Sequence, residues 1–153
     1  FTIGNYYISP EHFEQLKKHE VKPEDILISL VGTHGKISLV PKGIEKGIIN
    51  PRLLRIRFDN SKALPKFMKI VLNSKYIEIQ VKKFVHGLTM EIMNTSILTK
   101  IIFLIPPLPE QQKIATILSN IASKITSQEQ YKEKLERLKK SLMQKLLTGE
   151  VRV

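Results

Sequence analysis

The residue types that most often carry catalysis are sparse in this chain and are not spaced for it. Asp25 and Asp59 are the only aspartates, so a metal-dependent nuclease would have few ligands to draw on. The histidines at positions 12, 19, 34 and 86 lack the spacing of metal ligands, and no cysteine is present to supply a thiolate. We therefore expect no catalytic residue, no metal site and no cofactor.

Three short stretches have a superficial likeness to catalytic or cofactor-binding motifs. Residues 32–36 (GTHGK) are too short for a phosphate-binding loop, and no Ser or Thr directly follows the lysine, so a hairpin turn is the better interpretation. Residues 50–53 (NPRL) have no accompanying glycine-rich fingerprint, so we expect a turn and not an adenine methyltransferase motif. Residues 78–80 (EIQ) have glutamine where a nuclease pattern requires lysine. The sequence predicts a binding protein.

The charge distribution indicates what is bound. The net charge is +11, and residues 42–83 hold eleven basic side chains against three acidic ones. Residues 109–153 are closer to balance, with nine basic and five acidic side chains. A lysine-rich solvated surface is the alternative, but arginines at 52, 55 and 57 within six residues favour nucleic acid. We expect a polyanion to bind the domain that contains residues 42–83, and a protein to bind the helix in residues 109–153.

Short alternating segments predict how the first 107 residues are folded. A helix is expected at 10–19, with Ser9 as its N-cap, and a second helix at 64–73. The expected strands are 25–31 and 36–40, which form a hairpin, together with 52–58 and 97–105. Residues 75–85 fit either a strand or a helix. Strands with interspersed helices predict an α+β domain built largely on hairpins.

Residues 108–147 are expected to form one long helix. Pro109 suits the first turn, where its missing N–H would have no partner, and Glu110 complements the positive end of the helix dipole. No proline or glycine occurs from Lys113 to Leu147, and Gly149 follows where a left-handed cap is usual. At 1.5 Å per residue this helix is roughly 60 Å long, which is too long for a small globule and predicts a partner.

Apolar residues recur along this helix with the seven-residue period of a coiled coil. Gln128 interrupts the repeat, and the apolar seam slips by one residue near it. The residues expected to pack in the coil are Ile114, Leu118, Ile121, Ile125, Tyr131, Leu135, Leu138 and Leu142. A long helix docked along its own domain is the alternative, but the narrow stripe favours coiled-coil packing.

Several of these stretches together resemble one protein family. They are residues 25–36 (DILISLVGTHGK), 50–56 (NPRLLRI), 105–114 (IPPLPEQQKI) and 146–153 (LLTGEVRV). Over essentially its whole length the chain resembles the DNA specificity subunit of type I restriction–modification systems. The proline-rich start of the helix and the Leu-Leu-Thr-Gly ending are the most specific parts of this resemblance.

The resemblance implies an architecture and a division of labour. Members of this family carry two target-recognition domains, each reading half of a split DNA site, joined by two long antiparallel helices that set the spacing and dock methyltransferase subunits. By this resemblance, residues 1–107 are a target-recognition domain that is incomplete at its N-terminus. Residues 108–153 are then one spacer and dimerisation helix with a short tail. The missing initial methionine and second unit predict a truncated protein, a half-length subunit or a fragment.

Candidate DNA contacts follow from the charge pattern and the predicted loops. The expected phosphate contacts are Arg52, Arg55, Arg57, Lys82 and Lys83. The candidates for base contacts are Thr33, His34, Lys36, His86 and Thr89. For each of these last five, an ordinary turn residue is the alternative.

We therefore expect a non-catalytic, sequence-reading subunit whose partners are double-stranded DNA and the methyltransferase and restriction subunits of a type I complex. With one recognition domain, it is expected to form an antiparallel homodimer through the seam and to read a symmetric split site. The alternatives are the recognition domain of a single-chain restriction–methyltransferase enzyme and a basic coiled-coil scaffold without sequence specificity. No apolar stretch approaches the length of a membrane span, and no signal peptide is evident, so we expect a cytoplasmic protein. The resemblance implies that it is prokaryotic.

Overall fold

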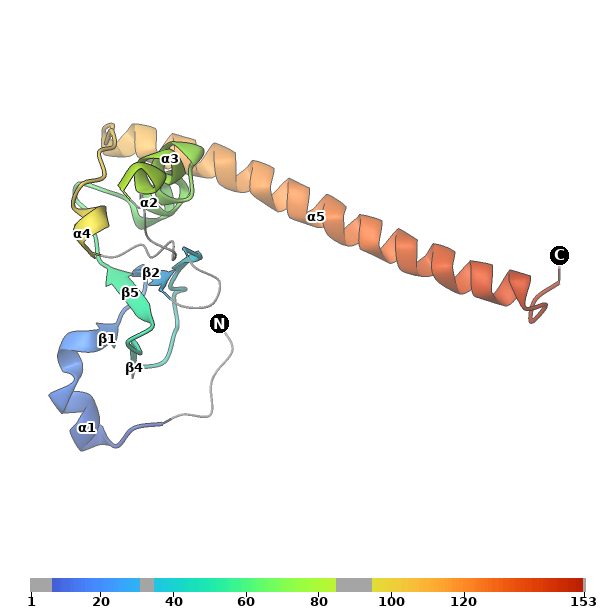
Figure 1. Cartoon of the computed structure of the whole chain (residues 1–153), viewed down its shortest axis with the longest axis horizontal. Coiled ribbons are helices and arrows are strands. Elements are labelled where there is room, and N and C mark those ends of the chain that lie inside the picture. The colour runs from blue at the N-terminus through green and yellow to red at the C-terminus, as the bar shows by residue number, and fades with distance from the viewer. Residues whose placement is uncertain (1–6, 31–34, 85–94, 153) are drawn as a thin grey trace. The chain divides into compact units, whose positions relative to one another are not determined.

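The computed structural model describes residues 7–30, 35–84 and 95–152 and divides the chain into two compact units, residues 1–112 and 113–153. The first unit contains short helices and small antiparallel sheets, and the second consists mainly of one long helix (Figure 1). Among the described helices, none is both long enough and apolar enough to cross a membrane. The mixed α+β class predicted from the sequence is confirmed.

The first described helix starts where its capping residues predict. In α1 (Pro10–Gln15), the Ser9 hydroxyl accepts a hydrogen bond of 3.3 Å from the His12 amide, and Pro10 occupies the first turn. A 3-10 helix, η1 (Lys17–His19), continues after Leu16. Residues 10–19 are therefore helical as predicted, although the α-helix changes to the tighter 3-10 form before its end.

Three short strands form the central antiparallel sheet, in the order β3-β2-β5; Figure 1 labels β2 and β5. They are β2 (Ile26–Ser29), β3 (Ile37–Leu39) and β5 (Leu53–Ile56), so the predicted hairpin and the third strand are confirmed. Leu27 in the middle strand lies opposite Ser38 on one side and Arg55 on the other. A separate two-stranded ribbon pairs β1 (Glu20–Val21) with β4 (Gly47–Ile48).

Helices and the central sheet enclose the core of the first unit. Helix α2 (Pro65–Leu72) contacts β3, and α3 (Lys75–Phe84) contacts α2 in turn. Ile26, Ile28, Met68 and Ile77 are completely buried. Residues 75–85, which the sequence left open between strand and helix, are thus helical up to Phe84. Ile77 is the one buried residue of α3, which contacts α2, and tertiary packing decides the choice.

The strand predicted at residues 97–105 is wrong. A four-residue helix, α4 (Thr95–Leu98), occupies the start of that stretch, and no strand follows it. The Ile102 amide donates to Gln80 Oε1 at 2.9 Å, and Gln80 Nε2 donates to the Ile102 carbonyl at 2.7 Å. One glutamine side chain of α3 thus satisfies the backbone groups that a neighbouring strand would otherwise pair.

The long helix α5 (Leu108–Leu147) has the limits that its sequence predicts (Figure 1). Near its start Gln111 is completely buried, and its amide accepts from the Leu64 amide at 2.8 Å. The same side chain donates to the carbonyls of Lys62 at 2.9 Å and Pro106 at 2.7 Å. At the other end Gly149 has a φ of 73°, the left-handed cap expected after the helix. Coiled-coil packing of α5 stays a prediction.

Candidate nucleic-acid interface

Two of the predicted DNA-contacting residues lie at the same end of the central sheet. We call this the turn end, and it comprises Ser29, Leu30, Gly35, Lys36 and Arg52. The Ser29 amide donates to the Lys36 carbonyl at 3.0 Å, and the Leu30 amide donates to the Arg52 carbonyl at 2.9 Å. Lys36 and Arg52 therefore flank the end of β2 on its two sides, at the start of residues 31–34.

Arg52 owes its position to a tight local turn. Asn50 Oδ1 accepts a hydrogen bond of 2.9 Å from the Arg52 amide, which is the geometry of an Asx turn. Arg52 and Lys36 are both exposed, and neither side chain has an acidic partner in the described part of the chain. Their charges are therefore available to a phosphate backbone, which supplies most of the affinity of DNA-binding proteins.

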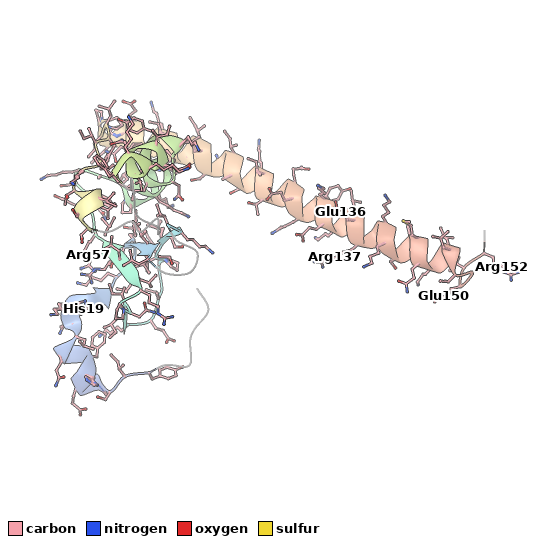
Figure 2. All side chains as sticks on the ribbon, viewed as in Figure 1. His19, Arg57, Glu136, Arg137, Glu150 and Arg152 are labelled. Carbon is pink, nitrogen blue, oxygen red and sulfur yellow. The ribbon has the colours of Figure 1, made fainter. Side chains whose placement is uncertain are left out.

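Arg55 and Arg57 point toward the opposite end of the sheet and are engaged within the protein (Figure 2 labels Arg57). The Arg55 guanidinium donates to the carbonyl of Glu20 and, at 3.0 Å, to that of Lys18. Arg57 Nη2 also donates to the Glu20 carbonyl, at 3.2 Å. The two arginines therefore tie β5 and the residue after it to η1 and β1. Contact of either residue with DNA stays a prediction.

Arg57 makes its strongest contact with a buried aspartate. Its Nε and Nη2 atoms donate to the two carboxylate oxygens of Asp25, each at 2.7 Å, and the Asp25 side chain is 1% exposed. The Lys22 amide donates to the same carboxylate at 2.7 Å, across a turn in which Glu24 has a left-handed φ of 69°. Nothing in the local sequence around Asp25 identifies Arg57 as its partner.

The protonation of Asp25 is set by opposing effects. Burial by itself raises the pKa of this carboxyl. The hydrogen bonds from Arg57 and from the Lys22 amide, with the positive charges of Arg57 and Arg55, act in the other direction and are larger together. The pKa of Asp25 is therefore lower than its ordinary value, and the carboxylate is charged at neutral pH.

The lysines proposed on α3 differ in their surroundings. Lys82 lies 2.7 Å and Lys75 3.0 Å from Glu78 on the same helix face, and hydrogen bonds from these two lysines lower the pKa of Glu78. Lys83 is exposed and has no ion-pair partner among the described residues. Part of the positive charge of Lys82 is thus offset within the helix, whereas that of Lys83 is open to a ligand.

Four of the predicted contacts, Thr33, His34, His86 and Thr89, lie outside the described residues. Two further exposed lysines that are not among the predicted contacts, Lys66 and Lys69, lie on α2. Lys66 and Lys69 are three residues apart in a helix that Pro65 begins, so the sequence alone indicates that both lie on one helix face. In the described ranges, no group of three or more acidic, histidine or cysteine side chains could hold a metal ion.

Comparison with known proteins identifies the kind of molecule that carries this surface. Residues 2–137 match the family model described as the type I restriction modification DNA specificity domain. The chain belongs to this family.

Two curated specificity-domain relatives from Methanocaldococcus jannaschii support the assignment. One is the type I restriction enzyme MjaVIII specificity subunit, 28% identical over 151 residues that cover 96% of this chain and 36% of that protein. The other is the putative type I restriction enzyme MjaX specificity subunit, 31% identical over 151 residues that cover 99% of this chain and 34% of that protein. The chain thus spans about a third of the length of these relatives.

The fold of the specificity domain is also found in a solved structure. The crystal structure of the HsdS subunit from Thermoanaerobacter tengcongensis matches with a TM-score of 0.64 and 19% sequence identity. The match covers 81% of this chain and 32% of that one. At this level of identity the likeness concerns the fold, namely small antiparallel sheets followed by a long helix.

Proposed function

We propose that the chain is a non-catalytic DNA sequence-recognition unit of a type I restriction–modification complex. In this proposal it binds one half of a split DNA target and positions the methyltransferase and restriction subunits, in the cytoplasm of a prokaryote. The observation that carries the proposal is the family match over residues 2–137. The net charge of +11 and the unpaired cations at the turn end support a polyanionic ligand.

The contacts within the first unit suggest how binding is divided among the candidate residues. Lys36, Arg52 and Lys83 are exposed and have no acidic partner among the described residues, which suits phosphate contacts. Arg55 and Arg57 support the sheet from which Lys36 and Arg52 extend, so we assign them an indirect role. Phosphate contacts carry no information about the bases, so other residues must read the DNA sequence. We assign that role to residues near the turn end.

Random-site selection with the purified chain and a matching type I modification subunit tests this function. Recovery of one motif, or of two motifs separated by a fixed gap, is the expected result. Strong binding without any enriched motif would refute sequence recognition and leave a basic scaffold, for which affinity falls steeply with salt and is the same for unrelated duplexes.

Single substitutions test the assignment of the turn end. We expect Lys36→Ala and Arg52→Ala each to lower DNA affinity on all duplexes and to reduce the slope of log K against log salt by about 0.9. Lys140→Ala in α5 is the matched control, because it removes the same charge from an exposed position. An effect of the control as large as that of Arg52→Ala would show that net charge alone determines binding.

We further propose that the chain self-associates through the apolar seam of α5. All eight seam residues lie on the helix, and seven of them are large apolar side chains that are between 41% and 58% exposed, from Leu118 to Leu142. Replacing Leu135 and Leu142 by Glu should convert a dimer into a monomer in analytical ultracentrifugation. A parent protein that is already monomeric, or a double variant that remains dimeric, would contradict this proposal.

A further inference from the structure

Helix α2 carries two lysines on the side opposite its buried face. Its buried residues are Pro65, Phe67, Met68 and Leu72. A helix turns by about 100° per residue, so Lys66 and Lys69 lie about 60° apart and point away from that buried face. Both lysines are exposed, and neither has an acidic partner in the described part of the chain. We call this pair the α2 lysines.

The stability of α2 does not explain a lysine at position 66. Lys66 lies in the first turn of the helix, which contains no acidic residue, and the N-cap Leu64 supplies no side-chain hydrogen bond. Because the N-terminus of a helix is the positive end of its dipole, a cation in the first turn is slightly unfavourable for the helix. An anionic ligand bound to this face gives the lysine a favourable role.

Helix α2 is held firmly within the first unit. The Leu64 amide donates to Gln111 Oε1 at 2.8 Å, and Gln111 Nε2 donates to the Lys62 carbonyl at 2.9 Å. The helix also contacts β3, the strand that Lys36 of the turn end directly precedes. The α2 lysines and the turn end therefore extend from the same packed elements, and such a surface loses less conformational entropy when it binds a ligand.

From these observations we infer that the α2 lysines bind the phosphate backbone of DNA, as a set of contacts separate from the turn end. The inference rests on the proposed DNA recognition and adds a second anchoring point to it. Duplex DNA carries one negative charge for about each 1.7 Å of its axis, so a single duplex offers phosphates to more than one set of cations. Phosphate contacts carry no base information, so the α2 lysines should strengthen binding to every duplex by the same factor.

The neighbouring lysines are less suited to this role. Lys62 Nζ lies 3.9 Å from the carboxylate of Asp59, and both side chains are exposed. On α3, Lys75 and Lys82 share the carboxylate of Glu78. A nearby carboxylate offsets part of the attraction of each of these lysines for a phosphate. The inference is therefore limited to the two lysines of α2 that have no such neighbour.

Binding of the full chain to a duplex of unrelated sequence, measured across a range of salt concentrations, tests the inference. Each phosphate contact that is lost lowers the slope of log K against log salt by about 0.9. The double variant Lys66→Ala/Lys69→Ala should therefore lower this slope by about 1.8, and its affinity at about 0.1 M salt should fall by roughly 10- to 100-fold. An unchanged slope would overturn the inference.

The matched control is Lys18→Ala/Lys46→Ala. These two lysines are exposed, and neither has an acidic partner among the described residues of the first unit. They lie near the β1–β4 ribbon, where the Arg55 guanidinium donates to the Lys18 carbonyl. The control removes the same charge and should lower the slope by less than about 0.5. A decrease as large as that of the α2 variant would show that net charge alone determines binding, and would overturn the inference.

The stability of the α2 variant separates a binding role from a structural one. Alanine has the highest helix propensity, and the change removes a cation from the positive end of the helix. The urea midpoint of the first unit should therefore stay the same or rise slightly while DNA affinity falls. A lower midpoint that accompanies the loss of affinity would assign these lysines a structural role and overturn the inference.

The same measurements distinguish failure of this inference from failure of the proposed function. A parent chain that selects a motif, together with an α2 variant that binds as tightly as the parent, would refute the α2 contacts and leave DNA recognition standing. A parent that binds duplexes without selecting a motif would refute sequence recognition, whereas the change in salt slope would still report on the α2 lysines. A parent that binds no duplex at all would refute both.

Discussion

Removal of the Arg57 side chain should destabilise the sheet much more than removal of the Arg52 side chain at the other end of β5. Arg57 donates two hydrogen bonds of 2.7 Å to the carboxylate of Asp25, which is 1% exposed. In Arg57→Ala the buried carboxylate keeps only its hydrogen bond from the Lys22 amide. Arg52 is exposed at the turn end, and its side chain has no acidic partner in the described residues. The two arginines, both predicted to bind phosphate, should therefore behave differently.

The size of the effect follows from the burial of the two partners. Removing one member of a buried ion pair costs about 3–5 kcal/mol, because the other charge stays buried without compensation. The side chain of Arg57 is 43% exposed, so water reaches one side of the pair and reduces this figure. We expect Arg57→Ala to lower the free energy of unfolding of the first unit by about 2–3 kcal/mol. Arg52→Ala should change it by less than about 0.5 kcal/mol.

Hydrogen exchange measured by mass spectrometry can separate this unit from the long helix. Peptides from residues 20–57 report on β2 and β5, whereas α5 dominates a circular dichroism signal. A loss of 2–3 kcal/mol corresponds to exchange faster by roughly 30- to 150-fold in these peptides. Peptides from residues 120–147 serve as the internal control and should not change.

Two results would refute this reasoning. Equal exchange in Arg57→Ala and Arg52→Ala would mean that the pair with Asp25 does not stabilise the sheet. The double variant Asp25→Asn/Arg57→Ala gives the second test. If it loses as much stability as the two single variants lose together, the two residues are not coupled. The coupled pair requires the double variant to lose less stability than that sum.

Three further predictions concern pH and two buried or bridging glutamines. The pKa of Asp25 is lower in the folded state than in the unfolded chain, so the charged Asp25 stabilises the folded protein. This stabilisation should be fully present above about pH 4 and be lost as the pH falls from there toward the folded pKa. The urea midpoint of unfolding should fall over the same range. Gln111→Ala leaves three backbone groups without the partner that Gln111 supplies, and it should lower the free energy of unfolding, measured in urea, by about 2–4 kcal/mol. The exposed control Lys113→Ala should lower it by less than about 0.5 kcal/mol. Gln80→Ala should speed exchange of the Ile102 amide roughly tenfold, and unchanged exchange would show that the bridge contributes nothing.

Local signals in the sequence identified several elements correctly. The Ser9 cap and Pro10 mark the start of α1, and Pro109 and Gly149 bracket α5 at the limits found in the structure. Such signals work because capping and left-handed cap conformations depend on a few adjacent residues. The apolar run at 26–28 likewise identified the middle strand of the sheet, whose residues are buried.

Pairings between distant residues could not be read in the same way. The run at 97–105 has the composition of a strand, but its start is helical, and Gln80, more than twenty residues earlier, pairs with the backbone N–H and C=O of Ile102. Arg55 and Arg57 have the composition of a DNA-binding stretch, yet their nearest partners are Asp25 and the carbonyls of Lys18 and Glu20. In both cases the sequence gives the chemical type of the side chain and not the group that it meets.

The sequence by itself determined the family, the basic character, the long helix and its apolar seam, because each depends on residue type and order along the chain. Only the tertiary structure decided that Lys36 and Arg52 lie at the same end of the sheet, on the two sides of β2, while Arg57 pairs with Asp25. These relations arise from the β3-β2-β5 order and from its register, which set which distant residues become neighbours.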